Sequence, residues 1–117
     1  MRCEANGRAV TEPRVVALAD VALVPEAPGI ASRAVGVGGT RRAMVECGPG
    51  VLHEEWCAEG HSGSVLAGEV TYEFEGGDRG PLRATASQGF RLTDEGSRHR
   101  GRAGPDGARL FLIDRAG

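Results

Sequence analysis

Hydrophobic residues in this chain fall into short runs that are separated by polar and turn-forming residues. The clearest alternation is in residues 70–75, where valine, tyrosine and phenylalanine would share one face of a strand and threonine and glutamate the other. No stretch keeps the i, i+3, i+4, i+7 spacing of an amphipathic helix. Many short strands with frequent turn signals are typical of an all-β sandwich or barrel. The apolar runs that would form the strands are residues 15–18, 21–24, 43–45, 64–66, 70–74 and 110–113.

Nineteen glycines and six prolines indicate where these strands would end. We expect residues 67–69 to form a tight turn between two strands, and residues 76–78 to end the second of them. We expect residues 101–107, which include a Pro-Asp-Gly sequence, to form a hairpin loop before the final strand. The glycine-rich residues 35–40 resemble a phosphate-binding loop, but no strand–loop–helix pattern follows, so we interpret them as a flexible linker.

Length and composition predict one small domain. The 117 residues suffice for one modest core, and with 4% aromatic residues that core must consist mainly of valine, leucine, alanine and isoleucine. We predict that residues 1–12 are a disordered tail and that residues 13–117 form the domain. The formal net charge of -2 gives no electrostatic reason to expect a nucleic acid or an anionic membrane as a partner.

The cysteine content predicts a reducing environment. The chain has three cysteines, Cys3, Cys47 and Cys57, an odd and low number for a disulfide framework. The N-terminus has no apolar stretch of the signal-peptide kind, and no apolar run is long enough to cross a membrane. We therefore expect a soluble, cytoplasmic protein.

Residues 53–61 hold most of the side chains that could bind a metal ion or transfer protons. If residues 53–57 form a strand, His53, Glu55 and Cys57 share one face, with Cβ atoms about 6.5 to 7 Å apart. A shift of one residue would instead bring Glu54 and Trp56 inward. The remaining histidine, His99, could join the group only through the tertiary fold. The candidates within the segment are His53, Glu54, Glu55, Cys57, Glu59 and His61.

This segment and residues 89–99 resemble the two metal-binding motifs of the cupins, which are small barrels of the double-stranded β-helix type. Counting back from Gly68, the family's two histidine positions and its glutamate position are occupied by Glu55, Cys57 and His61. The second motif is one residue short, and the turn proline is missing. The resemblance covers residues 40–114 and implies a cupin barrel. The divalent metal ion that it implies would be held by Glu55, Cys57, His61 and His99.

The resemblance favours a metal-dependent enzyme that acts on a small polar metabolite. A mixed set of carboxylate, thiolate and imidazole ligands favours zinc and redox-neutral lyase, isomerase or cyclase chemistry, with iron, manganese and nickel as alternatives. Side chains that would move protons in such a site are Glu55, His61 and Tyr72.

A metal-free ligand-binding or sensory domain is the alternative function. The same side chains would then hydrogen-bond a small organic ligand, with no metal and no reaction. A third hypothesis is a metal-free isomerase or epimerase in which His61 is the base and Tyr72 the acid. The partner is a small molecule in every case, and the resemblance also implies a homodimer formed through an edge strand.

Overall fold

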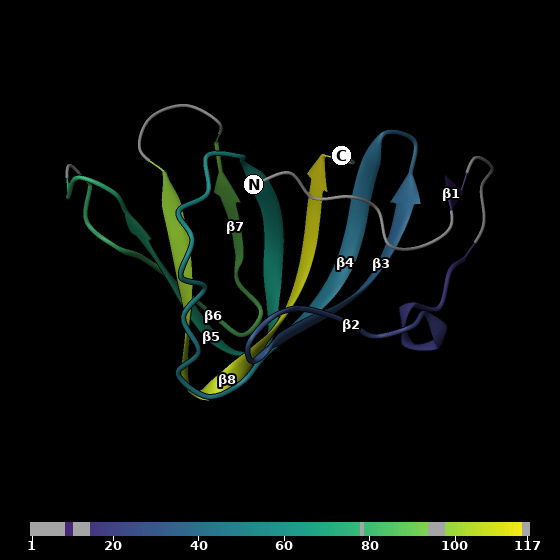
Figure 1. The fold of residues 1–117 in the computed structure, drawn as a ribbon, viewed down its shortest axis with the longest axis horizontal. Helices are drawn as coiled ribbons and strands as arrows, with labels where there is room; N and C mark the ends of the chain where they lie inside the picture. Colours follow the sequence, from purple (N-terminus) through teal and green to yellow (C-terminus); the bar gives the residue numbers. More distant parts are fainter. Residues whose placement is uncertain (1–8, 11–14, 78, 94–97, 116–117) are drawn as a thin grey trace.

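The chain folds almost entirely into β-strands (Figure 1). The computed structural model describes residues 9–10, 15–77, 79–93 and 98–115. Its only helical element in those ranges is the short 3-10 helix η1 (Leu18–Asp20). This confirms the prediction of an all-β fold. The strands are β1 (Ala9–Val10), β2 (Val24–Ala27), β3 (Ile30–Val37), β4 (Thr40–Cys47), β5 (His61–Phe74), β6 (Leu82–Thr85), β7 (Gly89–Leu92) and β8 (His99–Arg115).

Strands β3 and β4 form a hairpin with a two-residue turn. Val37 pairs with Thr40, and the two residues between them, Gly38 and Gly39, have φ angles of 49° and 82°. Positive φ at both positions is the geometry of a type I′ turn, which glycine adopts without a steric penalty. The expected flexible linker in residues 35–40 is therefore wrong, because the strands continue up to the two glycines.

Strands β5 and β8 are long and bent, and they replace two of the expected turns. Gly68 has a φ of 74°, and the pairing with β8 shifts on both sides of it, yet β5 continues to Phe74. Residues 104–107 of β8 lie opposite a single residue of β5 and bulge outward without ending the strand. A Cβ atom on Gly68 would lie 2.2 Å from the carbonyl oxygen of Gly107. The glycines therefore allow two strands to cross closely at a bend, and the expected turn at 67–69 and loop at 101–107 are wrong.

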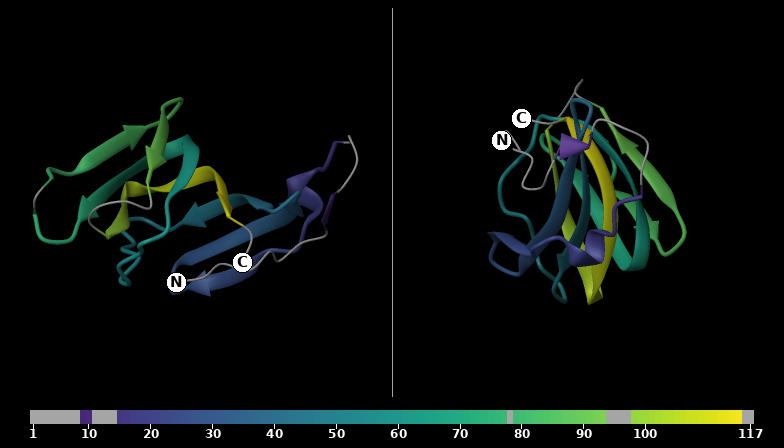
Figure 2. Two further views of the ribbon diagram at one scale, coloured as in Figure 1. Left: turned by 90° about the horizontal axis from the view of Figure 1, so that it is seen from above. Right: turned by 90° about the vertical axis from the view of Figure 1, so that its right-hand side faces the viewer.

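The two bends divide the sheet into two halves, and Figure 1 shows β8 descending in one and rising in the other. We call one the β4 half: β3, β4, β7, residues 61–67 of β5 and residues 108–115 of β8. We call the other the β6 half: β6 with residues 69–74 of β5 and 99–103 of β8. Figure 2 shows the two halves at an angle to each other. Side chains from both line one cavity, so the halves face each other across it.

The core between the halves is built from small apolar side chains, as the low aromatic content predicts. Val65 and Ala43 are almost fully buried, and Tyr72 is the one aromatic residue among the buried apolar residues that the structure describes. Cys47 and Cys57 are free thiols, whereas Cys3 lies outside the described ranges. No helix within those ranges is long and apolar enough to span a membrane.

The predicted tail, residues 1–12, falls mostly outside the described residues. The exception is β1, where Ala9 and Val10 pair in parallel with Gly36 and Val37 of β3. These two residues are thus part of the sheet edge.

Candidate functional site

Three polar rings meet between the two halves of the sheet because β5 and β8 bend from one half into the other. β5 contributes His61 at its first residue and Tyr72 beyond the bend, and β8 contributes His99 at its first residue. The ring centroids are 5.4 Å apart for His61 and His99, and 5.8 Å apart for His61 and Tyr72. The centroids of Tyr72 and His99 are 5.9 Å apart. The structure thus brings together three residues that are far apart along the chain, and all three were predicted site residues.

His61 and Tyr72 form a neutral hydrogen-bonded pair. The Nε2 atom of His61 lies 3.3 Å from the hydroxyl oxygen of Tyr72. Burial, with a smaller contribution from His99, lowers the pKa of His61 from its ordinary 6.5 to about 4. Burial, followed by the thiols of Cys47 and Cys57, raises the pKa of Tyr72. Both groups are therefore uncharged at neutral pH, where the tyrosine hydroxyl can donate to the unprotonated nitrogen.

His99 presents a buried nitrogen atom that has no partner. Only 2% of the residue is exposed, and its Nε2 makes no hydrogen bond in the described structure. Burial and the proximity of His53 lower the pKa of His99. Its backbone is held by Cys57 through two hydrogen bonds of 2.7 and 2.9 Å. Because a buried polar atom without a partner destabilises a protein, this nitrogen is the atom at which a ligand would be most favourable.

The segment that supplied most of the candidate ligands is not a regular strand. Between Leu52 and Cys57, only these two residues form bridges to β8, and the backbone bends at Glu55. His53 and Cys57 line the cavity, whereas Glu55 is exposed and is not part of the lining. The prediction that all three share one face is wrong at Glu55, because strict alternation needs a continuously paired strand.

The alternative register is not observed either. Glu54 is also exposed, and Trp56 lies outside the cavity lining, where the guanidinium carbon of Arg100 sits 4.2 Å from its ring centroid. Glu59 is half-buried, and its carbonyl oxygen accepts a hydrogen bond of 3.7 Å from the Cys57 thiol.

The four predicted metal ligands do not assemble into a metal site. Cys57, His61 and His99 line the same cavity, but Glu55 is outside it. Within the described ranges, no group of three or more histidine, cysteine, aspartate or glutamate side chains is placed to hold a metal ion. A zinc site needs at least three protein ligands. As these side chains lie, they do not converge as the three ligands that the metal of the cupin motifs needs, so they do not fit that metal.

The cavity next to the three rings has a volume of about 140 Å³. Apolar side chains, among them Val45, Val70 and Leu110, form the part of its wall between the polar groups. Cys47 is also in the lining, and burial, with a smaller contribution from Glu26, raises the pKa of its thiol to about 11. A thiol that stays protonated at neutral pH is a poor nucleophile, so Cys47 contributes surface to the cavity and no reactive group.

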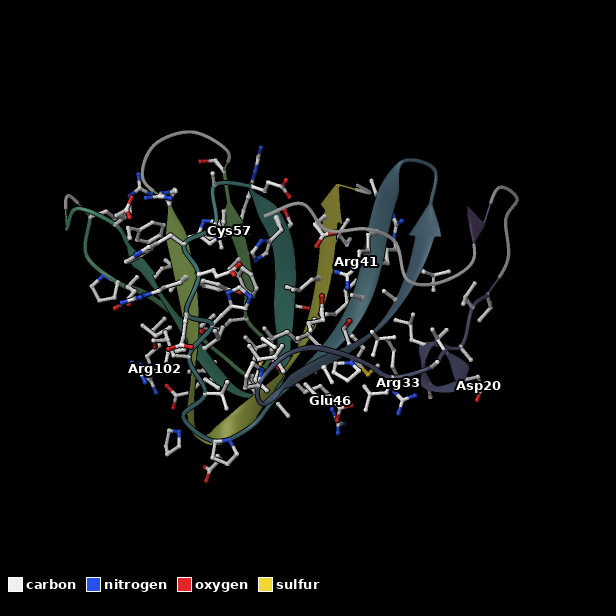
Figure 3. All side chains as sticks on the ribbon, viewed as in Figure 1. Asp20, Arg33, Arg41, Glu46, Cys57 and Arg102 are labelled. Carbon is white, nitrogen blue, oxygen red and sulfur yellow. The ribbon has the colours of Figure 1, made fainter. Side chains whose placement is uncertain are left out.

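A buried arginine that we did not predict lines the same cavity. Arg41 is 2% exposed, and its terminal nitrogens contact Glu26 at 3.2 Å and Asp114 at 3.4 Å. They also donate to the hydroxyl of Ser32 at 3.1 Å. Figure 3 labels Arg41 between β8 and β4, to the right of Cys57. One signal was available: residue 41 shares the face of the buried Ala43 and Val45 along β4.

Known proteins with this fold were found only through structure. No protein-family model and no curated protein sequence matches the chain. A protein of unknown function from Rhizobium leguminosarum superposes with a TM-score of 0.72 at 20% identity, covering 91% of this chain and 99% of the other. An RmlC-like cupin from Shewanella frigidimarina superposes with a TM-score of 0.69 at 13% identity, covering 91% and 93%. The chain has the cupin fold.

A larger cupin shows how the fold occurs in longer chains. Oxalate decarboxylase from Bacillus subtilis superposes with a TM-score of 0.70 at 17% identity, covering 92% of this chain but only 31% of the decarboxylase. The resemblance inferred from residues 53–69 and 89–99 is thus confirmed for the fold. At these identities the comparisons establish the cupin architecture, and the chemistry has to be argued from the cavity itself.

Proposed function

We propose that this cupin binds a small, uncharged polar molecule inside its barrel, with His61, Tyr72 and His99 as the hydrogen-bonding groups. The observation that carries the proposal is the partnerless Nε2 of His99, buried beside the neutral pair of His61 and Tyr72. A ligand hydroxyl or carbonyl could hydrogen-bond this nitrogen in one of its tautomers. The apolar walls would exclude water from the rest of the ligand.

The protonation states favour binding over proton transfer. An efficient general base has a pKa near the working pH, and the pKa of His61 lies well below neutrality. The raised pKa of Tyr72 likewise makes it a weak acid. Glu55, the third predicted catalytic residue, is exposed outside the cavity. We therefore rank a metal-free isomerase based on His61 and Tyr72 below a binding function.

A metal-dependent enzyme is the second candidate. It is favoured by the two unprotonated imidazoles that share one cavity with Cys57, and Bacillus subtilis oxalate decarboxylase, a cupin, has Mn(II) centers. Zinc, iron, manganese or nickel would each need a third protein ligand that the described residues do not place there. Elemental analysis of protein purified without chelators tests this candidate, and a stoichiometric metal would move it ahead of the metal-free function.

The binding function is tested by thermal shift against polyols and hydroxyketones, with and without chelator. We expect a member of this panel to stabilise the protein equally in both conditions. His99→Leu should abolish that stabilisation, because it removes the partnerless nitrogen and puts an apolar side chain of similar bulk in its place. Phe90→Leu is the matched control: Phe90 packs edge-on against His61 but offers no hydrogen-bonding group, so its variant should still respond. An equal loss of ligand-induced stabilisation in both variants would refute the role of His99 as a hydrogen-bonding group for the ligand.

The resemblance to cupins also leads us to propose a cytoplasmic homodimer. The free thiols of Cys47 and Cys57 suit a reducing compartment. Strands β6 and β7 each pair only with β5 among the described residues, so each offers an unpaired edge. Sedimentation analysis tests the dimer, and a single species of monomer mass would refute it.

A further inference from the structure

At the end of the cavity near Arg41, two buried hydrogen-bonding atoms have no partner. Arg41 uses its two terminal nitrogens on Glu26, Ser32 and Asp114, but its Nε has no partner. The Oδ1 oxygen of Asp114 also has none, because only Oδ2 faces the arginine. Both atoms are buried, and both side chains line the cavity. One is a donor and the other an acceptor.

The strand register places this end in the same row of the sheet as the histidine end. Arg41 of β4 pairs directly with Asp114 of β8. On the other side of β8, Ser62 of β5 pairs with Ile113. Because the two strands are antiparallel, the same register places His61 of β5 opposite Asp114. Neighbouring strands are about 4.8 Å apart, so this row spans about 10 Å from Arg41 to His61. A small molecule can therefore contact both ends.

We propose that Arg41 and Asp114 form a second recognition point for the ligand, specific for an uncharged group that both accepts and donates a hydrogen bond, such as a carboxamide. This inference rests on the proposed function, since it assumes that the cavity takes a small organic molecule. The carbonyl oxygen of the ligand accepts from the Nε–H of Arg41, and its N–H donates to Oδ1 of Asp114. A carboxamide thus offers an acceptor for the one partnerless atom and a donor for the other.

Charged ligand groups fit this end less well. A carboxylate could accept from Nε of Arg41 but would place a negative oxygen against Oδ1 of Asp114, with Glu26 nearby as a second carboxylate. An ammonium group could donate to Asp114 but has no lone pair to accept from Nε of Arg41, which would stay without a partner beside a second positive charge. In a cavity of low dielectric constant such like-charge contacts are strongly unfavourable, so the pair discriminates by charge.

Three probes of similar size test the proposal: butyramide, butyrate and butylammonium, titrated by NMR at neutral pH. We expect butyramide to bind the unmodified protein about tenfold more tightly than either ion, the effect of roughly one lost charge-assisted contact. Asp114→Asn keeps an oxygen for Arg41 and puts an amide donor where Oδ1 was. The variant should therefore reverse the order and prefer butyrate. Glu46→Gln is the control: Glu46 is half-buried outside the cavity and pairs with Arg109, so the variant makes the same charge change there and should keep the original order.

The outcomes separate this inference from the proposed function. Butyrate or butylammonium binding the unmodified protein as tightly as butyramide overturns the inference, and this result stands even where Asp114→Asn does not fold. An unchanged order in a folded Asp114→Asn variant also overturns it. If none of the three probes binds while a polyol binds through His99, the second recognition point is refuted and the proposed function holds. If no molecule of either panel binds, both fail.

Discussion

The two polar ends of the cavity bury their polar groups in opposite ways. At the histidine end, burial lowers the pKa of His61 and of His99, so the imidazoles are neutral. At the arginine end the charge of Arg41 is kept, and two carboxylates and a hydroxyl surround it. Burial raises the pKa of Asp114, and the neighbouring guanidinium opposes that change.

Both ends leave a hydrogen-bonding atom without a partner, but they differ in how much the fold loses when a neighbouring group is removed. A neutral nitrogen such as Nε2 of His99 can be left without a partner at a loss of about 1 to 3 kcal/mol. A buried charge that loses its partner destabilises the fold by more, because its desolvation is no longer compensated. The histidine end is therefore suited to exchange ligands, and the arginine end combines recognition with holding β2, β3, β4 and β8 together.

The largest effect should follow from removing the buried charge. Arg41→Met leaves Asp114 and Glu26 without their cation, and we expect the free energy of unfolding to fall by about 3 to 5 kcal/mol. Urea denaturation measures the loss. Adding Asp114→Asn to this variant should recover part of it, because the orphaned carboxylate becomes neutral. A loss below about 1 kcal/mol would show that the arginine end is not an essential ion-pair cluster.

Acidification should weaken the histidine end next. The pKa of His61 is lower in the folded chain, about 4, than its ordinary 6.5, so the unfolded chain binds the proton more tightly between these values. Stability is thus full above pH 6.5 and is lost as the pH falls towards 4, by about 3 kcal/mol. Urea midpoints measured across this range test the sign and the size.

His61→Gln is the control for the acid effect. The variant cannot take up the proton, so its stability should fall by less over the same pH range, with the contribution of His99 remaining. Comparing the two proteins cancels the titration of Asp114, which is present in both. Parallel curves for the two proteins would contradict the assignment to His61.

Loss of the tyrosine hydroxyl should have a smaller effect. Tyr72→Phe removes the hydrogen bond of 3.3 Å to His61 and keeps the ring in the core. We expect about 1 kcal/mol of destabilisation and about a fivefold weaker affinity for a neutral ligand. Urea denaturation and ligand titration measure the two quantities. An unchanged affinity would remove Tyr72 from the binding groups.

The smallest effect should come from an ion pair outside the cavity. Arg98 holds both carboxylate oxygens of Glu75 at 2.6 Å, closer than any contact of Arg41, yet about half of its side chain is exposed. We expect Arg98→Ala to change the free energy of unfolding by less than about 1 kcal/mol, because water screens the pair. A loss as large as that of Arg41→Met would show that contact distance outweighs burial.

The strands and part of the site could be predicted because their signals are local. Alternation in residues 70–75 correctly indicated that Val70 and Tyr72 share a buried face. The motif spacing indicated that His61 and His99 would approach each other. Glycine signals were harder to interpret: a positive φ suits a turn as well as a bulge, and Gly68 occupies a bulge because β8 continues beside it.

One wrong placement and one omission in the site involve charged residues whose surroundings come from distant strands. Glu55 was expected inside on strand alternation, but its segment forms bridges to β8 only at Leu52 and Cys57, and the backbone bends at Glu55 between them. Arg41 was not predicted to be a site residue, although it alternates in step with the inward-facing Ala43 and Val45 along β4. A buried guanidinium is stable only with partners, and its partners lie on β2, β3 and β8.

The period of the apolar residues and the positions of the glycines are properties of neighbouring residues, and they were enough to predict an all-β chain. The pairing of His61 with His99 was implied by the resemblance to the cupin motifs. Whether a charged side chain enters the interior depends on the groups that meet it there, and those groups are brought from up to 73 residues away. Only the folded barrel therefore decided that Arg41 lies inside with its carboxylates and that Glu55 lies in water.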